Sequence, residues 1–558
     1  MKRTLLVSAL IWGSITLCLA HSKLAPELNG SQDGSSAGGS VEVIVQYNTV
    51  PTATHQNRIQ ALGGKVHAGL PLVNALHAHV PGSQLQTLAN DPEVRYISPN
   101  RGLRGRLDNT AGAVLANYAW DQGLQGAGIG VAVIDSGVAF VDDLKNPAGN
   151  NWRVVGNFDT IGGGPNDQYG HGTHVAGIIA GNATDSTCAQ CDRQLRGMAP
   201  NATIVNFHAL DLNGNGTDAS VIHAIQQAIW FKNTYNIRVM NLSLGRPVYE
   251  SYRLDPLCQA VEAAWKAGIV VVVAAGNDGR DNSLGTDGYG TISAPANDPY
   301  VITVGAMNAK GTPDRADDVM TSYSSKGPTA IDHIAKPDLV APGNRVVSLL
   351  ASAGTTLPKA YPANRVPVSY YQNGSNQAPS NSYFVLNGTS MAAPVVSGAA
   401  ALLLQKNPAL TPDQVKARLM KTAYKNLPPV TTITDGGNTY VVQSDIFTVG
   451  AGYLDLQAAL SSTDVANGVA KSPAVAVDPA TGSVYFVQND AALWGSAALW
   501  GATTVWGSNV FVGSKAALWG SAALWGSSST TGYAALWGSA ALWGSTTDST
   551  DALIQGDN

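Results

Sequence analysis

Between about residue 110 and residue 460 the apolar residues fall into short, nearly continuous runs. The runs cover 129–134, 203–207, 238–244, 269–275 and 301–304. Runs of this kind are typical of strands buried on both faces of a sheet. Helical spacing is found between and after them, at 171–180, 220–235, 254–267, 390–405 and 411–422. Strands that alternate with helices predict an α/β fold, with a mostly parallel sheet flanked by helices.

A smaller α+β unit is predicted ahead of this domain. Alternating strands are expected at 41–47, 75–80 and 94–97, with helices at 55–62 and 83–89. A unit of about 60 residues is marginally stable alone, so it should dock on something larger. Its exit, residues 101–106, is rich in Gly and Arg and is expected to be exposed and cleavable. Residues 41–106 therefore have the pattern of a propeptide, after a flexible linker at 21–40, and residues 107–460 form the main domain.

The first residues have the pattern of a secretory signal. Lys2 and Arg3 precede an apolar stretch at 5–19, and Ala20 offers a small-residue cleavage site. The alternative, a membrane anchor, would need about 20 apolar residues. We therefore expect a signal peptide at 1–20 and a secreted product.

The last part of the chain is repetitive. After a linker at 461–490, Ala-Ala-Leu-Trp-Gly-Ser or a variant recurs over 491–545, which holds seven of the twelve tryptophans, and a polar C-terminus follows at 546–558. An even period places equivalent residues on one face of an extended chain. Exposed Trp rows favour association with a partner, a cell surface or another copy. Disorder without a role and a sugar-binding stripe are the alternatives.

Charge and cysteine content narrow the function classes. With a formal net charge of −5, the chain lacks the basic surface expected of a nucleic-acid-binding protein. After the signal, Cys188, Cys191 and Cys258 remain, so at least one thiol is unpaired within the chain. In an exported protein, the Cys188–Cys191 spacing favours a local disulfide over a zinc site.

Three small-residue motifs supply an Asp, a His and a Ser in that order: Asp135 after a strand, His171 at a helix start, and Ser390 at another helix start. A hydroxyl needs an adjacent base to become a nucleophile, so Ser390 would attack and His171 would accept its proton. Asp135 would orient the imidazole. Asn277, which follows the run at 269–275, could donate its amide to a developing oxyanion.

Each of these residues also has a plain structural interpretation. Ser390 could be the N-cap of a helix, and Asp135 and Asn277 could be turn residues. His174, three residues after His171, could hold a metal with it, but we expect a packed or hydrogen-bonded helix histidine. The occurrence of the four motifs together favours catalysis.

These motifs, quoted as Ile134-Asp135-Ser136-Gly137, His171-Gly172-Thr173-His174 and Gly388-Thr389-Ser390-Met391-Ala392, resemble those of the subtilisin-like serine proteases, over roughly 41–460. The resemblance implies an acyl-enzyme mechanism without a cofactor, and a propeptide that assists folding, inhibits the enzyme and is removed by self-cleavage.

The resemblance also implies how a peptide substrate binds. The segments Ser243-Leu244-Gly245 and Ala274-Ala275-Gly276 would form the walls of the primary specificity pocket, with a floor near Ser293-Ala294-Pro295. Gly214-Asn215-Gly216 would be the edge segment, so that the peptide adds as a strand between 212–216 and 243–245. No charged residue lies in the wall segments, which predicts an apolar or aromatic residue before the scissile bond.

In one respect the chain departs from the family. Many members carry a calcium loop after the catalytic His, but residues 182–197 do not have that pattern, although Asp143 resembles one calcium ligand. No metal-binding residues are predicted, and a structural calcium ion is left open.

Three functions are compatible with these observations. The leading hypothesis is a secreted, self-processed serine endopeptidase. A surface-associated binding protein that uses its Trp repeats is the second. A serine esterase is the third, but the chain lacks the Gly-x-Ser-x-Gly elbow around Ser390.

Overall fold

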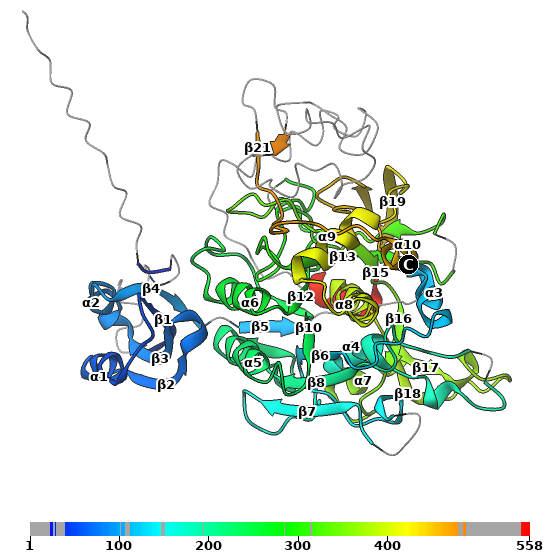
Figure 1. Ribbon diagram of the computed structural model, residues 1–558, viewed down its shortest axis with the longest axis horizontal. Coiled ribbons are helices and arrows are strands. Elements are labelled where there is room, and N and C mark those ends of the chain that lie inside the picture. The colour runs from blue at the N-terminus through cyan, green and yellow to red at the C-terminus, as the bar shows by residue number, and fades with distance from the viewer. Residues whose placement is uncertain are drawn as a thin grey trace, which may run out of the picture.

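A large mixed sheet forms the centre of the molecule (Figure 1). The computed structural model describes residues 23–25, 28, 40–100, 102–105, 112–146, 151–191, 193–283, 285–312, 315–477, 484–486 and 548–557. The sheet has eight strands in the order β14-β13-β12-β10-β6-β8-β7, with β15 beside β13. Its strands are β6 (Gly130–Asp135), β7 (Val154–Asp159), β8 (Thr203–His208), β10 (Ile237–Leu242), β12 (Val270–Ala274), β13 (Ile302–Asn308), β14 (Val319–Met320) and β15 (Leu339–Pro342). All neighbours are parallel except β13 and β14, which confirms the predicted mostly parallel sheet.

Helices cover both faces of this sheet. On one face, α5 (Asp218–Trp230) packs on α6 (Pro256–Lys266); on the other, α4 (His171–Ala180) packs on α8 (Thr389–Lys406). Burial on both faces explains why the strand sequences are apolar without alternation; every residue of β6, β12 and β13 is buried. The helix starts follow sequence signals: Asp255 caps α6, and Thr411 forms a capping box for α9 (Pro412–Thr422).

Some elements differ from the sequence-based expectation. The run at 238–244 is not one strand, because β10 ends at Leu242 and β11 (Leu244–Gly245) belongs to another sheet. In the polar stretch at 350–385, where no helix or strand was predicted, the structure has α7 (Thr356–Ala360), β17 (Arg365–Pro367) and most of β18 (Pro379–Leu386). The pattern also missed β7, β14 and β15, of which the last two are only two and four residues long.

Residues 40–99 form a separate antiparallel sheet with two helices. The elements are β1 (Ser40–Tyr47), α1 (Ala53–Ala61), β2 (Lys65–Leu70), β3 (Ala75–Pro81), α2 (Leu85–Ala89) and β4 (Val94–Pro99), and the strand order is β2-β3-β1-β4. This unit docks on α5 and α6, and the Ala219 N–H of α5 donates at 2.8 Å to Oδ1 of Asn100, the residue after β4. Part of the expected linker is packed as well, since Leu24 is buried and pairs with Ile97 of β4.

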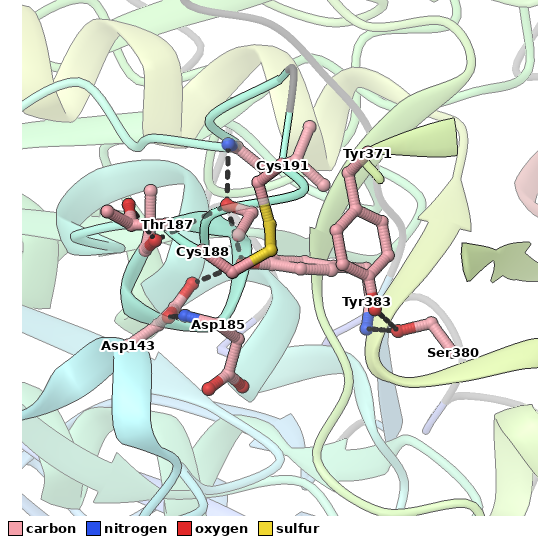
Figure 2. The surroundings of a disulfide bond; sticks show 11 residues. Asp143, Asp185, Thr187, Cys188, Cys191, Tyr371, Ser380 and Tyr383 are labelled. Atoms are coloured by element: carbon pink, nitrogen blue, oxygen red, sulfur yellow. Dashed lines mark hydrogen bonds between the residues drawn. A yellow bond between two sulfur atoms is a disulfide. The ribbon is translucent and has the colours of Figure 1, made fainter. Parts of the chain in front are cut away.

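The segment after α4 is closed by a disulfide between Cys188 and Cys191 (Figure 2). Beneath it lies Asp143, whose carboxylate accepts hydrogen bonds from Tyr383 Oη at 2.9 Å and from the Asp185 N–H at 2.7 Å. Each oxygen of this carboxylate therefore accepts one hydrogen bond from a protein donor. No cluster of three or more His, Cys, Asp or Glu side chains suited to a metal ion occurs among the described residues.

Two regions with sequence predictions lie outside the described residues: the signal segment at 1–20 and the repeats at 491–545. In the described part of the chain, none of the helices combines the length and the apolar character needed to cross a membrane.

Asp143 predicts a pH-dependent stability. Burial raises the pKa of its carboxyl to about 6, above the unfolded value. The favourable contribution is therefore complete below about pH 4 and is lost as the pH rises through about 6. In an inactive Ser390→Ala background, Asp143→Asn should remove this dependence. Between pH 4 and pH 7 the chain that keeps Asp143 should therefore lose about 2 kcal/mol of unfolding free energy relative to the variant, measured by urea unfolding.

Asp142→Asn provides the matched control, because Asp142 is the exposed neighbour on the same turn. It should keep the wild-type pH profile. If Asp143→Asn and wild type had parallel stability profiles, the pKa of Asp143 would not be raised in the folded protein.

Candidate active site

Asp135 and His171 form a buried pair at the end of the central strand. Asp135 is the last residue of β6, and His171 is the first of α4. The His171 Nδ1–H donates to Asp135 Oδ1 at 2.5 Å, and both side chains are fully buried. The two elements can approach because residue 172 is glycine: a Cβ there would lie 2.1 Å from the carbonyl oxygen of Gly137. The pair leaves His171 Nε2 as the basic nitrogen of the ring.

A second acidic residue, Asp167, which the sequence reasoning missed, holds this pair in place. Asp167 accepts hydrogen bonds from the N–H groups of Gly170 at 2.7 Å and Thr173 at 2.9 Å, and from Thr173 Oγ1 at 2.7 Å. It also accepts one from Ser136 Oγ at 3.0 Å, next to Asp135. Burial raises the pKa of the Asp167 carboxyl. Its position just ahead of a helix N-terminus is a signal that the sequence did carry.

Asn277 and Ser390 meet through Thr389, another residue that was not singled out from the sequence. The Thr389 N–H and Oγ1 donate to Asn277 Oδ1 at 2.9 and 3.0 Å. These two hydrogen bonds fix Oδ1 of the Asn277 amide, whereas its Nδ2 has no partner among the described residues. Ser390 is the second residue of α8, and its carbonyl oxygen accepts a hydrogen bond from Ser243 Oγ at 2.6 Å.

The strand order brings these residues to one edge of the sheet. β6, β10 and β12 are parallel neighbours, so Asp135, Ser243 and Asn277 all lie at or just beyond the carboxyl ends of adjacent strands. The other two candidate residues lie in the first turns of α4 and α8, and these helices pack on one another.

Four buried polar atoms at this edge have no hydrogen-bond partner among the described residues: Asp135 Oδ2, His171 Nε2, Ser390 Oγ and Asn277 Nδ2. An unpaired buried polar atom costs about 1–3 kcal/mol, so its presence needs a reason. One base, one hydroxyl and one donor without partners are the groups that acyl transfer requires.

His174 does not share this role. Its Nε2–H donates to the carbonyl oxygen of Phe384 at 3.0 Å, and burial lowers the pKa of its imidazole to about 3. It is a packed, hydrogen-bonded helix histidine, as expected.

The expected wall segments lie close to one another around Ser293. A Cβ on Gly245 would lie 2.5 Å from Ser293 Oγ, and a Cβ on Gly276 would lie 3.2 Å from the same atom. Ser243, Leu244, Ala274, Ala275 and Gly276 are buried, and Ser293 Oγ donates to the carbonyl oxygen of Ala275 at 3.2 Å.

The expected strand position between the two edge segments is filled by the chain itself. β5 (Gly102–Gly105) lies between β11 and β9 (Asn215–Thr217) in a three-stranded antiparallel sheet. Its register pairs Leu103 with Gly216 and Gly105 with Leu244. Gly214 lies just before β9 with φ +75°, and a Cβ there would lie 2.6 Å from the Tyr169 ring.

Comparison with known proteins agrees with this geometry. Residues 126–452 match the subtilase family. The chain is 37% identical over 357 residues to serine protease AprX of Bacillus subtilis, which covers 62% of this chain and 73% of that protein. It is 32% identical over 418 residues to subtilisin E of the same species, covering 74% of this chain and 87% of the relative.

The family match spans more than half of the 558 residues, and the match to subtilisin E spans most of both chains. The chain therefore belongs to the subtilase family and is a subtilisin-like serine endopeptidase.

Proposed function

We propose that this endopeptidase cleaves peptide bonds with Ser390 as nucleophile, His171 as general base and acid, Asp135 as the orienting carboxylate and Asn277 as an oxyanion donor. The observation that supports this most is the buried Asp135–His171 hydrogen bond of 2.5 Å, which leaves Nε2 free to accept a proton. Orientation of the imidazole by a buried carboxylate fixes the reactive tautomer.

The reaction follows from these positions. Ser390 Oγ attacks the carbonyl carbon of the scissile bond, and His171 Nε2 takes the hydroxyl proton. The electron pair of the C=O bond moves to its oxygen, which accepts hydrogen bonds from Asn277 Nδ2–H and the Ser390 N–H at the helix start. When the C–N bond breaks, the leaving nitrogen takes the proton from His171. Water then repeats the sequence on the acyl-enzyme and releases the acid.

We also propose that residues 41–106 are a propeptide that inhibits the enzyme in cis. The support is β5, which occupies the substrate strand position between β9 and β11, and the docking of the 40–99 unit on α5 and α6. A strand held on both sides by main-chain hydrogen bonds blocks any other peptide from the same place. Self-cleavage C-terminal to Gly105, within 106–111, would free the mature chain.

The enzyme is proposed to act outside the cell on polypeptides with an apolar or aromatic residue before the scissile bond. The N-terminal signal pattern and the surface disulfide support export. The uncharged walls around Ser293 support the preference. Attachment to a surface through 491–545 remains a proposal that rests on the Trp repeats alone.

Ser390→Ala tests both the nucleophile and self-processing. Wild type should lose its signal and propeptide, with a new N-terminus after Gly105, and should hydrolyse a peptide with Phe before the cleaved bond. The variant should keep the propeptide and lose at least 10³-fold in kcat. Intact mass and kinetics of the purified proteins measure the two effects. Equal processing of both chains would mean that another protease matures this one.

Asn277→Ala tests the oxyanion donor. Because the amide is proposed to bind only the developing oxyanion, kcat should fall about 10²–10³-fold while KM changes little. Asn282→Ala, at an exposed position five residues on, should leave both constants unchanged. A rise in KM with kcat intact would place Asn277 in ground-state binding.

Ser293→Asp tests the position of the specificity pocket. A carboxylate next to Gly245 and Gly276 should attract a cation, so the ratio of kcat/KM for Lys over Phe before the scissile bond should rise at least about tenfold. Ser283→Asp adds the same charge at an exposed site and should leave the ratio unchanged. An unchanged ratio in Ser293→Asp would place the pocket elsewhere.

A further inference from the structure

The chain returns to the catalytic domain after the repeats. Residues 548–557 form α12 (Asp548–Gln555) and two further residues that pack on the domain, although the sequence predicted only a polar end. Ala552, Leu553 and Asp557 are 0%, 3% and 1% exposed, whereas Gln555 is exposed. A loosely attached end would not bury an aspartate and a leucine together.

Asp557 is bound through both its side chain and its backbone. Its carboxylate accepts hydrogen bonds from Arg280 Nη2 at 2.7 Å, from Ser322 Oγ at 2.5 Å and from the Ser322 N–H at 2.7 Å. Its own N–H donates to Asn344 Oδ1 at 2.9 Å, and its carbonyl oxygen accepts from Asn344 Nδ2 at 2.9 Å. Five hydrogen bonds to one residue, one of them from the guanidinium of Arg280, whose side chain is 10% exposed, make a specific recognition site.

The residue before it must be glycine. Gly556 has φ +66°, which L side chains rarely adopt. A Cβ there would lie 2.2 Å from Asn387 Oδ1 and 2.4 Å from Asn344 Oδ1. The site therefore recognises the dipeptide Gly-Asp at the end of a short helix.

This contact reaches the turn that leads into Ser390. The carbonyl oxygen of Leu553 accepts hydrogen bonds from the Asn387 N–H at 3.0 Å and from Asn387 Nδ2 at 3.1 Å. Gly388, the N-cap of α8, then donates to the carbonyl oxygen of Gly343 at 3.0 Å. Asn387 lies three positions before Ser390, so the docked segment holds one end of the turn that sets the place of the hydroxyl.

We propose that residues 548–557 are an intramolecular docking peptide, recognised by its Gly-Asp end, which holds the turn before Ser390 and fastens the repeats to the domain at both ends. At the N-terminal end of the repeats, β22 (Val484–Phe486) pairs with β21 (Val475–Val477). The 61 residues from 487 to 547 connect the two anchors. At about 3.3 Å per residue this length is ample for docking on the same chain. Only the effect on the nucleophile rests on the proposed function.

The first test is hydrogen exchange on the full chain, with Ser390→Ala as the common background so that activity plays no part. Gly556→Ala should raise amide exchange at Asn387 and Gly388 and in 548–557 at least about tenfold, because the added methyl group dislodges the peptide. Gln555→Ala, one residue earlier and exposed, should exchange as the background does. Equal protection in both variants would overturn the proposal. Protection that disappears on dilution would also overturn it, since the peptide would then come from a second copy.

The second test separates positioning from binding in the active enzyme. A chain that stops at residue 546 should lose roughly ten- to hundredfold in kcat while KM stays within about twofold. A synthetic peptide of residues 546–558 should restore kcat, and the same peptide with Asp557→Asn should not. Unchanged kcat in the shortened chain would show that the segment does not position Ser390.

If the shortened chain fails to fold, the same comparison of kcat and KM is made on full-length Gly556→Ala and Gln555→Ala. A failure of the Ser390→Ala test of activity would leave the exchange result standing, so the two proposals can fail separately.

Discussion

The buried hydrogen bond between His171 and Asp135 is the constraint on which the rest of the site depends. Two titratable side chains with no exposed surface must be held at 2.5 Å, and only a packed frame can do this. The frame consists of a strand end and a helix start that approach each other at Gly172, where no side chain fits. Asp167 and Ser136 then fix the first turn of that helix.

The same frame connects catalysis with substrate binding. Arg246 follows β11 and lies buried between Asp218 and Asp255, at 2.8 Å from each carboxylate. These carboxylates are at the N-termini of α5 and α6, the helices on which the 40–99 unit docks. One cation thus ties the candidate wall segment to the surface that receives the N-terminal unit. Loss of this cation would remove the positive charge shared by two buried carboxylates, which is costly.

The turn before Ser390 is supported from three sides. Asn277 and Thr389 hold it from the sheet edge, Ser243 from the end of β10, and residues 548–557 from the far end of the chain. A hydroxyl that must react without a strong intrinsic nucleophilicity depends on such fixed geometry. The supporting segment, residues 548–557, lies more than 150 residues after this turn in the sequence. Its proposed docking would also attach the C-terminal side of the repeats to the domain.

The sequence by itself determined most strands of the sheet core and the main helices, and it singled out Asp135, His171, Asn277 and Ser390 as candidate catalytic residues. This was possible because the spacing of apolar residues, the helix caps and the small-residue motifs are all signals carried by residues close together in the sequence. Only the tertiary structure decided which groups support them. Asp167, Thr389, Asn387 and Asp557 are ordinary polar residues in sequence, and they acquire roles because strands and loops distant in the chain meet at one sheet edge. The division of 238–244 into two strands and the burial of Leu24 and Leu553 were decided in the same way, since a short apolar segment does not state which partner will cover it.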